Sequence, residues 1–307
     1  MPLKVIISGA TGLIGKRIIS KLIERGDSVS VITRNAQKAV KRIKAGVDFI
    51  EWNYKGMPMG LAEKLKEADA VIHLAGENIF SGRWNEEHKN KIYSSRVTST
   101  IMLAESIMHS RPKPSVFVCA SAVGYYGVKS DIPADENTLH GNDFLANVTK
   151  DWENASLPLE KAGVRCVKIR TGIVLDKKEG ALAKMLTPFK FFIGGPLGTG
   201  KQFFPWVHID DIVGLYLYAL DNKSMHGSYN AVAPVSITMK EFAASLGRVM
   251  KRPSFFHVPA FALKFLYGEG AGYLLSDVNV IPVRTNESGY EYKFTNVEDA
   301  LKDILKK

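Results

Sequence analysis

Three glycines near the start of the chain, Gly9, Gly12 and Gly15, have a spacing that suits a phosphorylated ligand. They lie between an apolar run and an amphipathic stretch, in "VIISGATGLIGKRIISKLIERG". In a strand-to-helix turn, Gly9 permits the tight turn, Gly12 lets the backbone approach a pyrophosphate and Gly15 lets the helix pack close to the strand. Free N–H groups and the positive dipole end of the helix then hold the phosphates. The pattern predicts a dinucleotide site that also includes Thr11, Leu13 and Ile14.

The second apolar run ends in "SVSVITRN", which places Arg34 where the adenosine ribose of a dinucleotide would lie. An acidic residue at this strand end selects a free 2′-hydroxyl, whereas an arginine accommodates a 2′-phosphate. The sequence therefore predicts NADP(H) over NAD(H), with an arginine that merely faces solvent as the alternative. Leu74, Ala75 and Gly76 end the fourth run and are predicted to pass along the ribose and phosphates, although a tight strand exit would use the same residues.

These residues need a scaffold that brings strand ends together. Apolar runs at 4–8, 28–33, 48–51, 70–74, 115–121 and 165–170 alternate with helical stretches near 13–25, 35–45, 59–67, 85–110 and 143–162. Such alternation requires crossover connections, which predicts an α/β, doubly wound parallel-sheet Rossmann fold with a smaller mixed C-terminal lobe. We assign 1–175 to an NADP-binding domain, to which segments around 203–235 return. Residues 176–307 form a substrate lobe, with a small C-terminal domain at about 250–300.

The composition narrows the class of protein. A hydrophobic fraction of 46% with 23% charged residues is ordinary for a globular protein, and neither a secretory signal nor a membrane-spanning run is visible, so we expect a cytoplasmic protein without membrane contact. The net charge of +10 has its densest run in "KAVKRIK", which lacks aromatic residues and predicts a solvated helix face, not nucleic-acid binding. Cys119 and Cys166 lie in strand-like runs and are interpreted as buried, and we expect no metal site.

Several longer motifs carry a resemblance to a known family. They are "SGATGLIG" at 8–15, "LAGEN" at 74–78, "CASAVGYYG" at 119–127 and "FFPWVHIDDIVG" at 203–214. With them the chain resembles an extended or atypical short-chain dehydrogenase/reductase, in the group of nucleotide-sugar epimerases that carry a small C-terminal domain of unassigned function. The resemblance covers nearly the whole chain. It implies that Ser121 hydrogen-bonds the substrate oxygen, and that the tyrosine of a Y-x-x-x-K pair moves the proton.

The tyrosine of that pair is missing from the helix expected to carry it, "GNDFLANVTKDWENAS". The lysine of this stretch is Lys150, and Ala146 stands four residues before it. Aligning the helix by its Trp-Glu pair instead places Leu145 and Thr149 at the two positions. Neither alignment supplies a tyrosine, so the acid/base group is left open.

Tyr125 and Tyr126 follow Ser121 closely and are the candidate substitutes for the missing tyrosine, with packing or substrate stacking as the alternative role. The resemblance also implies that the substrate meets the residues after the sixth strand and the glycine-rich loop. His208 has a second interpretation as a local hydrogen-bonding or capping residue. The predicted substrate-binding residues are Arg170, Gln202, Trp206 and His208.

Two functions remain open from the sequence. The first is hydride transfer with NADP(H) on a carbonyl compound or nucleotide sugar, as a reductase or an epimerase. The second is a non-catalytic NADP(H)-binding protein that senses redox state, which the missing tyrosine favours. The expected partner is a small molecule, and a homodimer through the helical stretches 85–110 and 143–162 is possible for this family.

Overall fold

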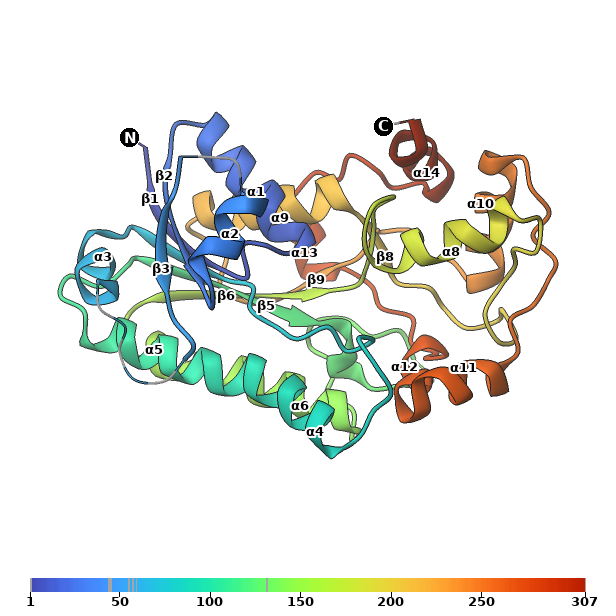
Figure 1. Cartoon of the computed structure of the whole chain (residues 1–307), viewed down its shortest axis with the longest axis horizontal. Helices are drawn as coiled ribbons and strands as arrows, with labels where there is room; N and C mark the ends of the chain where they lie inside the picture. Colours follow the sequence, from blue (N-terminus) through green and yellow to red (C-terminus); the bar gives the residue numbers. More distant parts are fainter. Residues whose placement is uncertain are drawn as a thin grey trace.

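The core of the molecule is a parallel sheet buried on both faces. The computed structural model describes residues 2–43, 46–54, 56, 58, 60–130 and 132–306. Within these ranges the sheet has seven strands in the order β3-β2-β1-β4-β5-β6-β9 (Figure 1). They are β1 (Lys4–Ser8), β2 (Ser28–Thr33), β3 (Asp48–Glu51), β4 (Ala70–His73), β5 (Val116–Ala122), β6 (Arg165–Thr171) and β9 (Gly227–Ala231). All neighbouring strands pair in parallel, which confirms the predicted doubly wound fold.

Helices cover both faces of the sheet, because nearly every residue of its central strands is apolar and must be shielded from water on either side. On one face α1 (Leu13–Glu24) and α9 (Ile209–Asp221) pack on the sheet, with α2 (Ala36–Arg42) beside them (Figure 1). On the other face lie α3 (Leu61–Glu67), α5 (Ser99–His109) and α6 (Phe144–Asn154). The strand order reverses between β1 and β4, and open sheets of this kind bind ligands at the carboxyl ends of strands flanking such a reversal.

Two predicted long helices are interrupted. The stretch predicted as a helix over 85–110 consists of α4 (Glu86–Tyr93), a π-helical segment (Ser94–Thr98) and α5. The stretch over 143–162 is divided into α6 and α7 (Leu157–Lys161), and α7 begins next to Pro158. Proline removes a backbone donor and is favoured in a first helical turn, which explains the second interruption.

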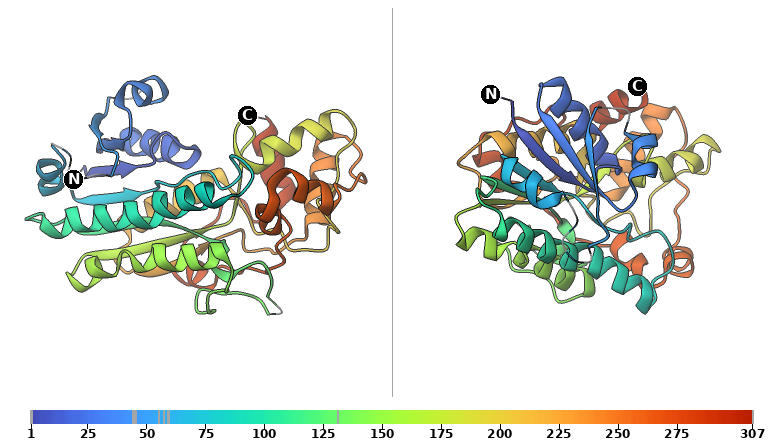
Figure 2. Two further views of the ribbon diagram at one scale, coloured as in Figure 1. Left: turned by 60° about the horizontal axis from the view of Figure 1, so that its bottom comes forward. Right: turned by 60° about the vertical axis from the view of Figure 1, so that its left-hand side comes forward.

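The C-terminal lobe packs beside the carboxyl ends of the strands (Figures 1 and 2). Its elements are β7 (Ile173–Leu175), α8 (Gly180–Lys190), β8 (Trp206–His208), α10 (Met239–Met250), α11 (Ala260–Tyr267), α12 (Ala271–Leu274), α13 (Val283–Glu287) and α14 (Val297–Lys306). A separate apolar core joins α8, α10 and α14. Strand β9 is not among the apolar runs of the sequence, yet it pairs with β6 and extends the sheet. Among the described residues, no helix is long and apolar enough to cross a membrane.

Candidate functional site

The turn between β1 and α1 can be built only with glycine at two positions. Gly9 has a φ of +67°, and a Cβ there would lie 2.4 Å from the carbonyl carbon of Leu74. A Cβ on Gly15 would lie 2.7 Å from Cα of Ala10. The backbone N–H of Gly12 donates to the Gly9 carbonyl at 3.0 Å, which closes the turn. The spacing noted in the sequence therefore has a steric cause in the fold.

The start of α1 has the features of an anion site. Gly12 is the N-cap residue, no side chain caps the helix, and its first turn contains no acidic residue. The first N–H groups of an α-helix have no partner within the helix, and its dipole favours negative charge at this end. The residues present therefore fit the phosphates of a dinucleotide, and the contacts of Thr11, Leu13 and Ile14 with a ligand stay a prediction.

The exit of β4 is held against this turn by an arginine. A Cβ on Gly76 would lie 3.2 Å from Cζ of Arg96, and an Nη of Arg96 donates to the Glu77 carbonyl at 2.9 Å. Arg96 belongs to the π-helical segment, and burial lowers its pKa to about 10, which leaves it charged at neutral pH. Leu74, Ala75 and Gly76 thus have a structural function, while their contact with a cofactor stays a prediction.

Arg34 lies exposed just after β2 and has the freedom that a ligand contact requires. Among the described residues its guanidinium makes no hydrogen bond or ion pair that would hold it elsewhere, while Asn35 caps α2. The positive charge of Arg34 is felt by Tyr54. Burial raises the pKa of that phenol to about 12, although a hydrogen bond with Ser8 and the Arg34 charge oppose the shift. The 2′-phosphate assignment remains a prediction.

Ser121 and Arg170 are joined in a buried network. The Ser121 hydroxyl donates to Oε1 of Glu153 at 2.6 Å, and the Arg170 guanidinium donates to both carboxylate oxygens at 2.8 and 2.9 Å. Both Ser121 and Arg170 are only 3% exposed. Burial acts to raise the pKa of the Glu153 carboxyl, but Arg170 and two serine hydroxyls lower it overall. The donors of Arg170 are used inside the protein and Ser121 has an internal partner, which argues against direct contact of Arg170 with substrate.

Tyr126 belongs to the same network. Its hydroxyl donates to Oδ1 of Asn230 at 2.7 Å and accepts from Arg170 at 3.0 Å. Burial raises the pKa of this phenol above its usual value, which disfavours proton exchange near neutral pH. Sequence analysis offered Tyr126 as an acid/base group, and the structure instead gives it a packing role.

Tyr125 is more accessible than its neighbour. The Arg170 guanidinium lies 3.5 Å from the centre of its ring, and the His140 ring meets it edge-on at 6.0 Å. Its hydroxyl makes no hydrogen bond to the described part of the chain. Of the two tyrosines proposed as acid or base, Tyr125 is the one with an uncommitted phenol.

The helix α6 supports the second of the two alignments considered for the missing pair. A Cβ built on Gly124, next to the end of β5, would lie 3.6 Å from Cβ of Leu145 and 4.0 Å from Oγ1 of Thr149. The Thr149 hydroxyl donates to the Leu145 carbonyl within the helix. Lys150 is one position further along and is half-buried, so the structure does not place it in the pair.

The remaining predicted substrate residues are interior. Gln202 donates from Nε2 to the Leu197 carbonyl at 2.9 Å and thereby closes the glycine-rich loop. Trp206 lies in the core of the C-terminal lobe. His208 caps α9, because its Nδ1 accepts from the Asp210 backbone at 3.0 Å. A loop hydrogen bond, core packing and helix capping use these three side chains, which argues against their contact with substrate. The capping alternative for His208 is confirmed.

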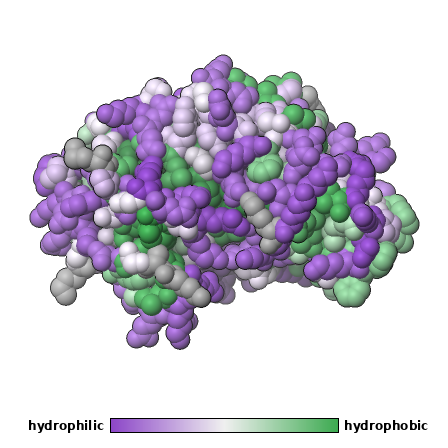
Figure 3. All heavy atoms as spheres, turned by 90° about the horizontal axis from the view of Figure 1, so that it is seen from above, coloured by the Kyte–Doolittle hydropathy of each residue, from purple (hydrophilic) through white to green (hydrophobic). Residues whose placement is uncertain are grey.

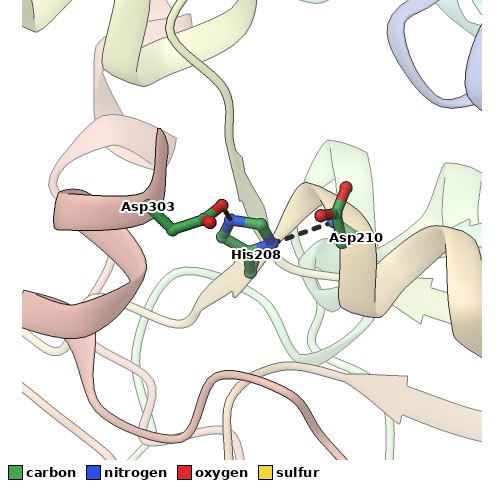
Figure 4. Close-up of side chains that lie close together, drawn as sticks. All are labelled: His208, Asp210 and Asp303. Atoms are coloured by element: carbon green, nitrogen blue, oxygen red, sulfur yellow. Dashed lines mark hydrogen bonds and ion pairs between the residues drawn. The ribbon is translucent and has the colours of Figure 1, made fainter. Parts of the chain in front are cut away.

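His208, Asp210 and Asp303 lie close enough together for a metal ion, and Figure 4 shows the Asp303 carboxylate facing the imidazole. Because Nδ1 accepts from the Asp210 N–H, the neutral ring carries its proton on Nε2, which is 3.3 Å from Oδ2 of Asp303. This tautomer directs a proton, not a lone pair, toward the carboxylate. Arg17 of α1 also pairs with Asp210 at 3.6 Å, so the cluster links α14 to the helix that follows the glycine turn.

Sequence analysis missed a group of aromatic and basic side chains where the lobe meets the loop after β4. Phe80 meets the Tyr267 ring edge-on at 5.7 Å, and Nζ of Lys184 lies 5.8 Å from the centre of that ring. Trp84 stacks on Tyr273 at 5.2 Å. The two aromatic contacts join residues nearly two hundred positions apart, and Lys184 is also distant in sequence from Tyr267, so no local sequence pattern could have revealed these contacts.

Comparison with known proteins supports this architecture. Residues 5–148 match the NAD dependent epimerase/dehydratase family, and residues 258–304 match a domain of unknown function, DUF1731. The chloroplastic SDR39U1 homolog of Arabidopsis thaliana, an epimerase family protein, is 41% identical over 98% of this chain and 86% of its own.

Solved structures give the same picture. The crystal structure of human epimerase family protein SDR39U1 (isoform 2) with NADPH is 34% identical, covers 99% of both chains and superposes with a TM-score of 0.86. A nucleoside-diphosphate sugar epimerase from Corynebacterium glutamicum is 30% identical over 99% of this chain and 58% of its own, with a TM-score of 0.78. The chain therefore belongs to the epimerase family that includes SDR39U1, an atypical branch of the short-chain dehydrogenases/reductases.

Proposed function

We propose that the protein binds NADP(H) and transfers hydride between its nicotinamide and a carbonyl or carbinol carbon of a small substrate. The observation that carries the proposal is the glycine turn at Gly9 and Gly15, which leads into an uncapped helix start without acidic residues. The NADPH in the human SDR39U1 crystal structure supports the same choice of cofactor, as does Arg34 at the end of β2.

Different residues of this chain would hold different parts of the cofactor. The first N–H groups of α1, from Leu13 to Gly15, would hold the pyrophosphate, and Arg34 would hold the 2′-phosphate. When bound, NADPH supplies the hydride. Tyr125, whose phenol has no internal partner among the described residues, would exchange a proton with substrate, while Ser121 would position the end of β5 through Glu153.

A nucleotide sugar is the substrate class that the aromatic and basic contacts favour. The rings of Phe80 and Tyr267 offer a stacking surface for a base, and Lys184 beside them offers a charge for a diphosphate. The Corynebacterium relative, a nucleoside-diphosphate sugar epimerase, supports this class. Epimerisation returns the hydride to the opposite face, whereas reduction consumes NADPH, so the two activities differ in net cofactor turnover.

One observation favours a second candidate, an NADP(H)-binding redox sensor without turnover. In the alignment by the Trp-Glu pair, Leu145 and Thr149 stand where the family resemblance implies tyrosine and lysine, and the other alignment supplies no tyrosine either. In that case the contacts of Arg17 with Asp210 and Asp176 would transmit cofactor occupancy from α1 to the C-terminal lobe.

A fluorescence titration with NADPH and NADH tests the cofactor. Charge-assisted hydrogen bonds contribute about 1.5–3 kcal/mol, so Arg34→Asp should weaken NADPH binding by roughly tenfold to a hundredfold and leave NADH binding nearly unchanged. Lys38→Asp, an exposed cation four residues away, is the matched control and should have a smaller effect. Similar affinities for both cofactors, unchanged in Arg34→Asp, would refute the 2′-phosphate assignment.

A second experiment separates enzyme from sensor. The protein is incubated with NADPH deuterated at the transferring position and a panel of carbonyl compounds and nucleotide sugars, and label in the substrate is measured by mass spectrometry. Transfer that Tyr125→Phe abolishes, with NADPH affinity retained, supports the enzyme and the role of Tyr125. Tight NADPH binding without transfer to any substrate favours the sensor.

A further inference from the structure

The outer end of the C-terminal lobe carries an unusual concentration of exposed apolar side chains. Among the described residues, all six exposed phenylalanines lie here, and the members of the group are between 45% and 77% exposed. Figure 3 shows hydrophobic residues gathered at the right-hand end of the molecule, where the lobe lies in Figure 1. We call this surface the apolar tip, and it consists of residues 191–193, Phe255, Phe256, Phe261, Phe265 and Leu266.

Backbone hydrogen bonds hold the segment after residues 191–193 and the segment of Phe255 and Phe256 together. The backbone N–H of Phe256 donates to the Gly194 carbonyl at 3.2 Å, and that of Val258 donates to the Pro196 carbonyl at 3.0 Å. The rings of Phe255 and Phe256 are 4.5 Å apart, and the Arg252 guanidinium lies 4.3 Å from the centre of the Phe192 ring. Two paired extended segments thus present these rings, so their exposure is not that of a loose loop.

Helix α11 turns its remaining apolar residues away from the predicted substrate region. Leu263 is buried and Tyr267 contacts Phe80. An α-helix advances about 100° per residue, which puts Phe265 about 160° from Tyr267 around the helix, with Phe261 one turn before it on the same face. Both phenylalanines therefore face outward, and a substrate beside Tyr267 would not cover them.

The two chain segments that carry the apolar tip contain basic residues and no acidic ones. Segments 181–209 and 242–268 contain seven lysines and arginines, and all 31 acidic residues of the chain lie outside them. Arg248 pairs with Glu298 at 2.9 Å, whereas the Arg252 guanidinium lies over the Phe192 ring. Lys251 directly precedes Arg252 in the sequence, and Lys264 directly precedes Phe265. Aromatic and aliphatic side chains interspersed with cations are typical of surfaces that bind anionic lipid headgroups and insert rings into the interface.

The same charge argues against a second copy of this chain as the occupant. An isologous contact through the apolar tip would bring like-charged lysines and arginines together, which costs free energy unless counterions intervene. A bilayer rich in anionic phospholipid offers both complementary charge and an apolar layer. We propose that the apolar tip docks this protein on the surface of an anionic phospholipid bilayer.

Vesicle flotation tests the proposal. Full-length protein with NADPH is mixed with vesicles of phosphatidylcholine alone, or of equal parts phosphatidylcholine and phosphatidylglycerol. We expect binding to the anionic vesicles that falls with added salt, and little binding to the neutral ones. Phe261→Ser with Phe265→Ser should abolish it, and each of Lys251→Gln and Lys264→Gln should weaken it about fivefold.

Matched variants guard against unfolding and non-specific charge effects. Leu139→Ser removes an apolar residue that is 84% exposed elsewhere, and Lys223→Gln removes an exposed lysine outside the apolar tip. Both should bind vesicles like the parent protein, and every variant should keep its NADPH affinity. The proposal is overturned by equal binding of the phenylalanine variant and the parent, or by absence of binding to anionic vesicles. Self-association without lipid that the phenylalanine variant abolishes would assign the surface to a second copy instead.

Discussion

Replacing Glu153 by glutamine tests the interpretation of the buried network most directly. In Glu153→Gln the shape is kept, but the Arg170 guanidinium loses its charged partner at 2.8 and 2.9 Å. Removing one member of a buried ion pair costs about 3–5 kcal/mol, because the remaining charge stays desolvated. Two serine hydroxyls, those of Ser121 and Ser228, also lose a carboxylate acceptor. We therefore expect a loss of at least about 3 kcal/mol in the free energy of unfolding.

Urea unfolding at neutral pH, followed by circular dichroism, measures this loss. Glu67→Gln is the control, because it breaks an exposed pair with Lys4 at 3.2 Å and should cost less than about 1 kcal/mol. Adding Arg170→Met to Glu153→Gln should restore part of the stability, since the unpaired buried charge is removed. If Glu153→Gln costs no more than Glu67→Gln, the network does not stabilise the fold as argued.

Three further predictions concern the glycine turn, a buried histidine and the last helix. Gly9→Ala places a Cβ 2.4 Å from Leu74 and should abolish NADPH binding in a fluorescence titration, whereas Gly26→Ala, at a φ of +88° with open space around it, should retain binding. Burial lowers the pKa of His73 from 6.5 to about 3, so the unfolded chain takes up a proton first as the pH falls. The free energy of unfolding should then fall by up to about 1.4 kcal/mol per pH unit between about pH 6.5 and pH 3. In urea unfolding, His73→Gln should lose less stability per pH unit than the parent protein. Equal pH dependence of the two proteins would contradict the burial of a neutral His73. Leu301→Ala opens the core under α14 and should cost about 2–5 kcal/mol in the same unfolding assay; a loss below 1 kcal/mol would contradict the packing.

The sheet was predictable because most of its strands contain clusters of apolar residues separated by helical stretches. The predicted bounds of β1, β2 and β3 coincide with those in the structure, and the helices between them follow from the requirement for crossovers. Strand β9 escaped prediction because its sequence, "GSYNA", contains polar residues that pair inside the protein. Asn230 of this strand, for example, accepts from Tyr126.

The candidate site was only partly predictable, for a physical reason. The steric demand for Gly9 and Gly15 is local, so spacing alone revealed it. Whether Arg170 faces a ligand or a buried carboxylate depends on Glu153, seventeen positions earlier on another element. A sequence pattern identifies a polar residue at a strand end, but the choice of partner is made by packing between strand and helix.

The π-helical segment between α4 and α5 has a consequence for insertions and deletions. A π segment holds one residue more than the same turns of α-helix, so Ser94–Thr98 acts as a one-residue offset between two helical halves. Deleting one of these residues would restore a regular α-helix and leave α4 and α5 nearly unrotated, because the wider turn already accommodates the extra residue. The wide turn that presents Arg96 to Gly76 and to the exit of β4 would then be lost. A regular helix here and the present support of the loop after β4 thus exclude each other. A chain with one residue fewer in this segment would need another residue to hold that loop in place.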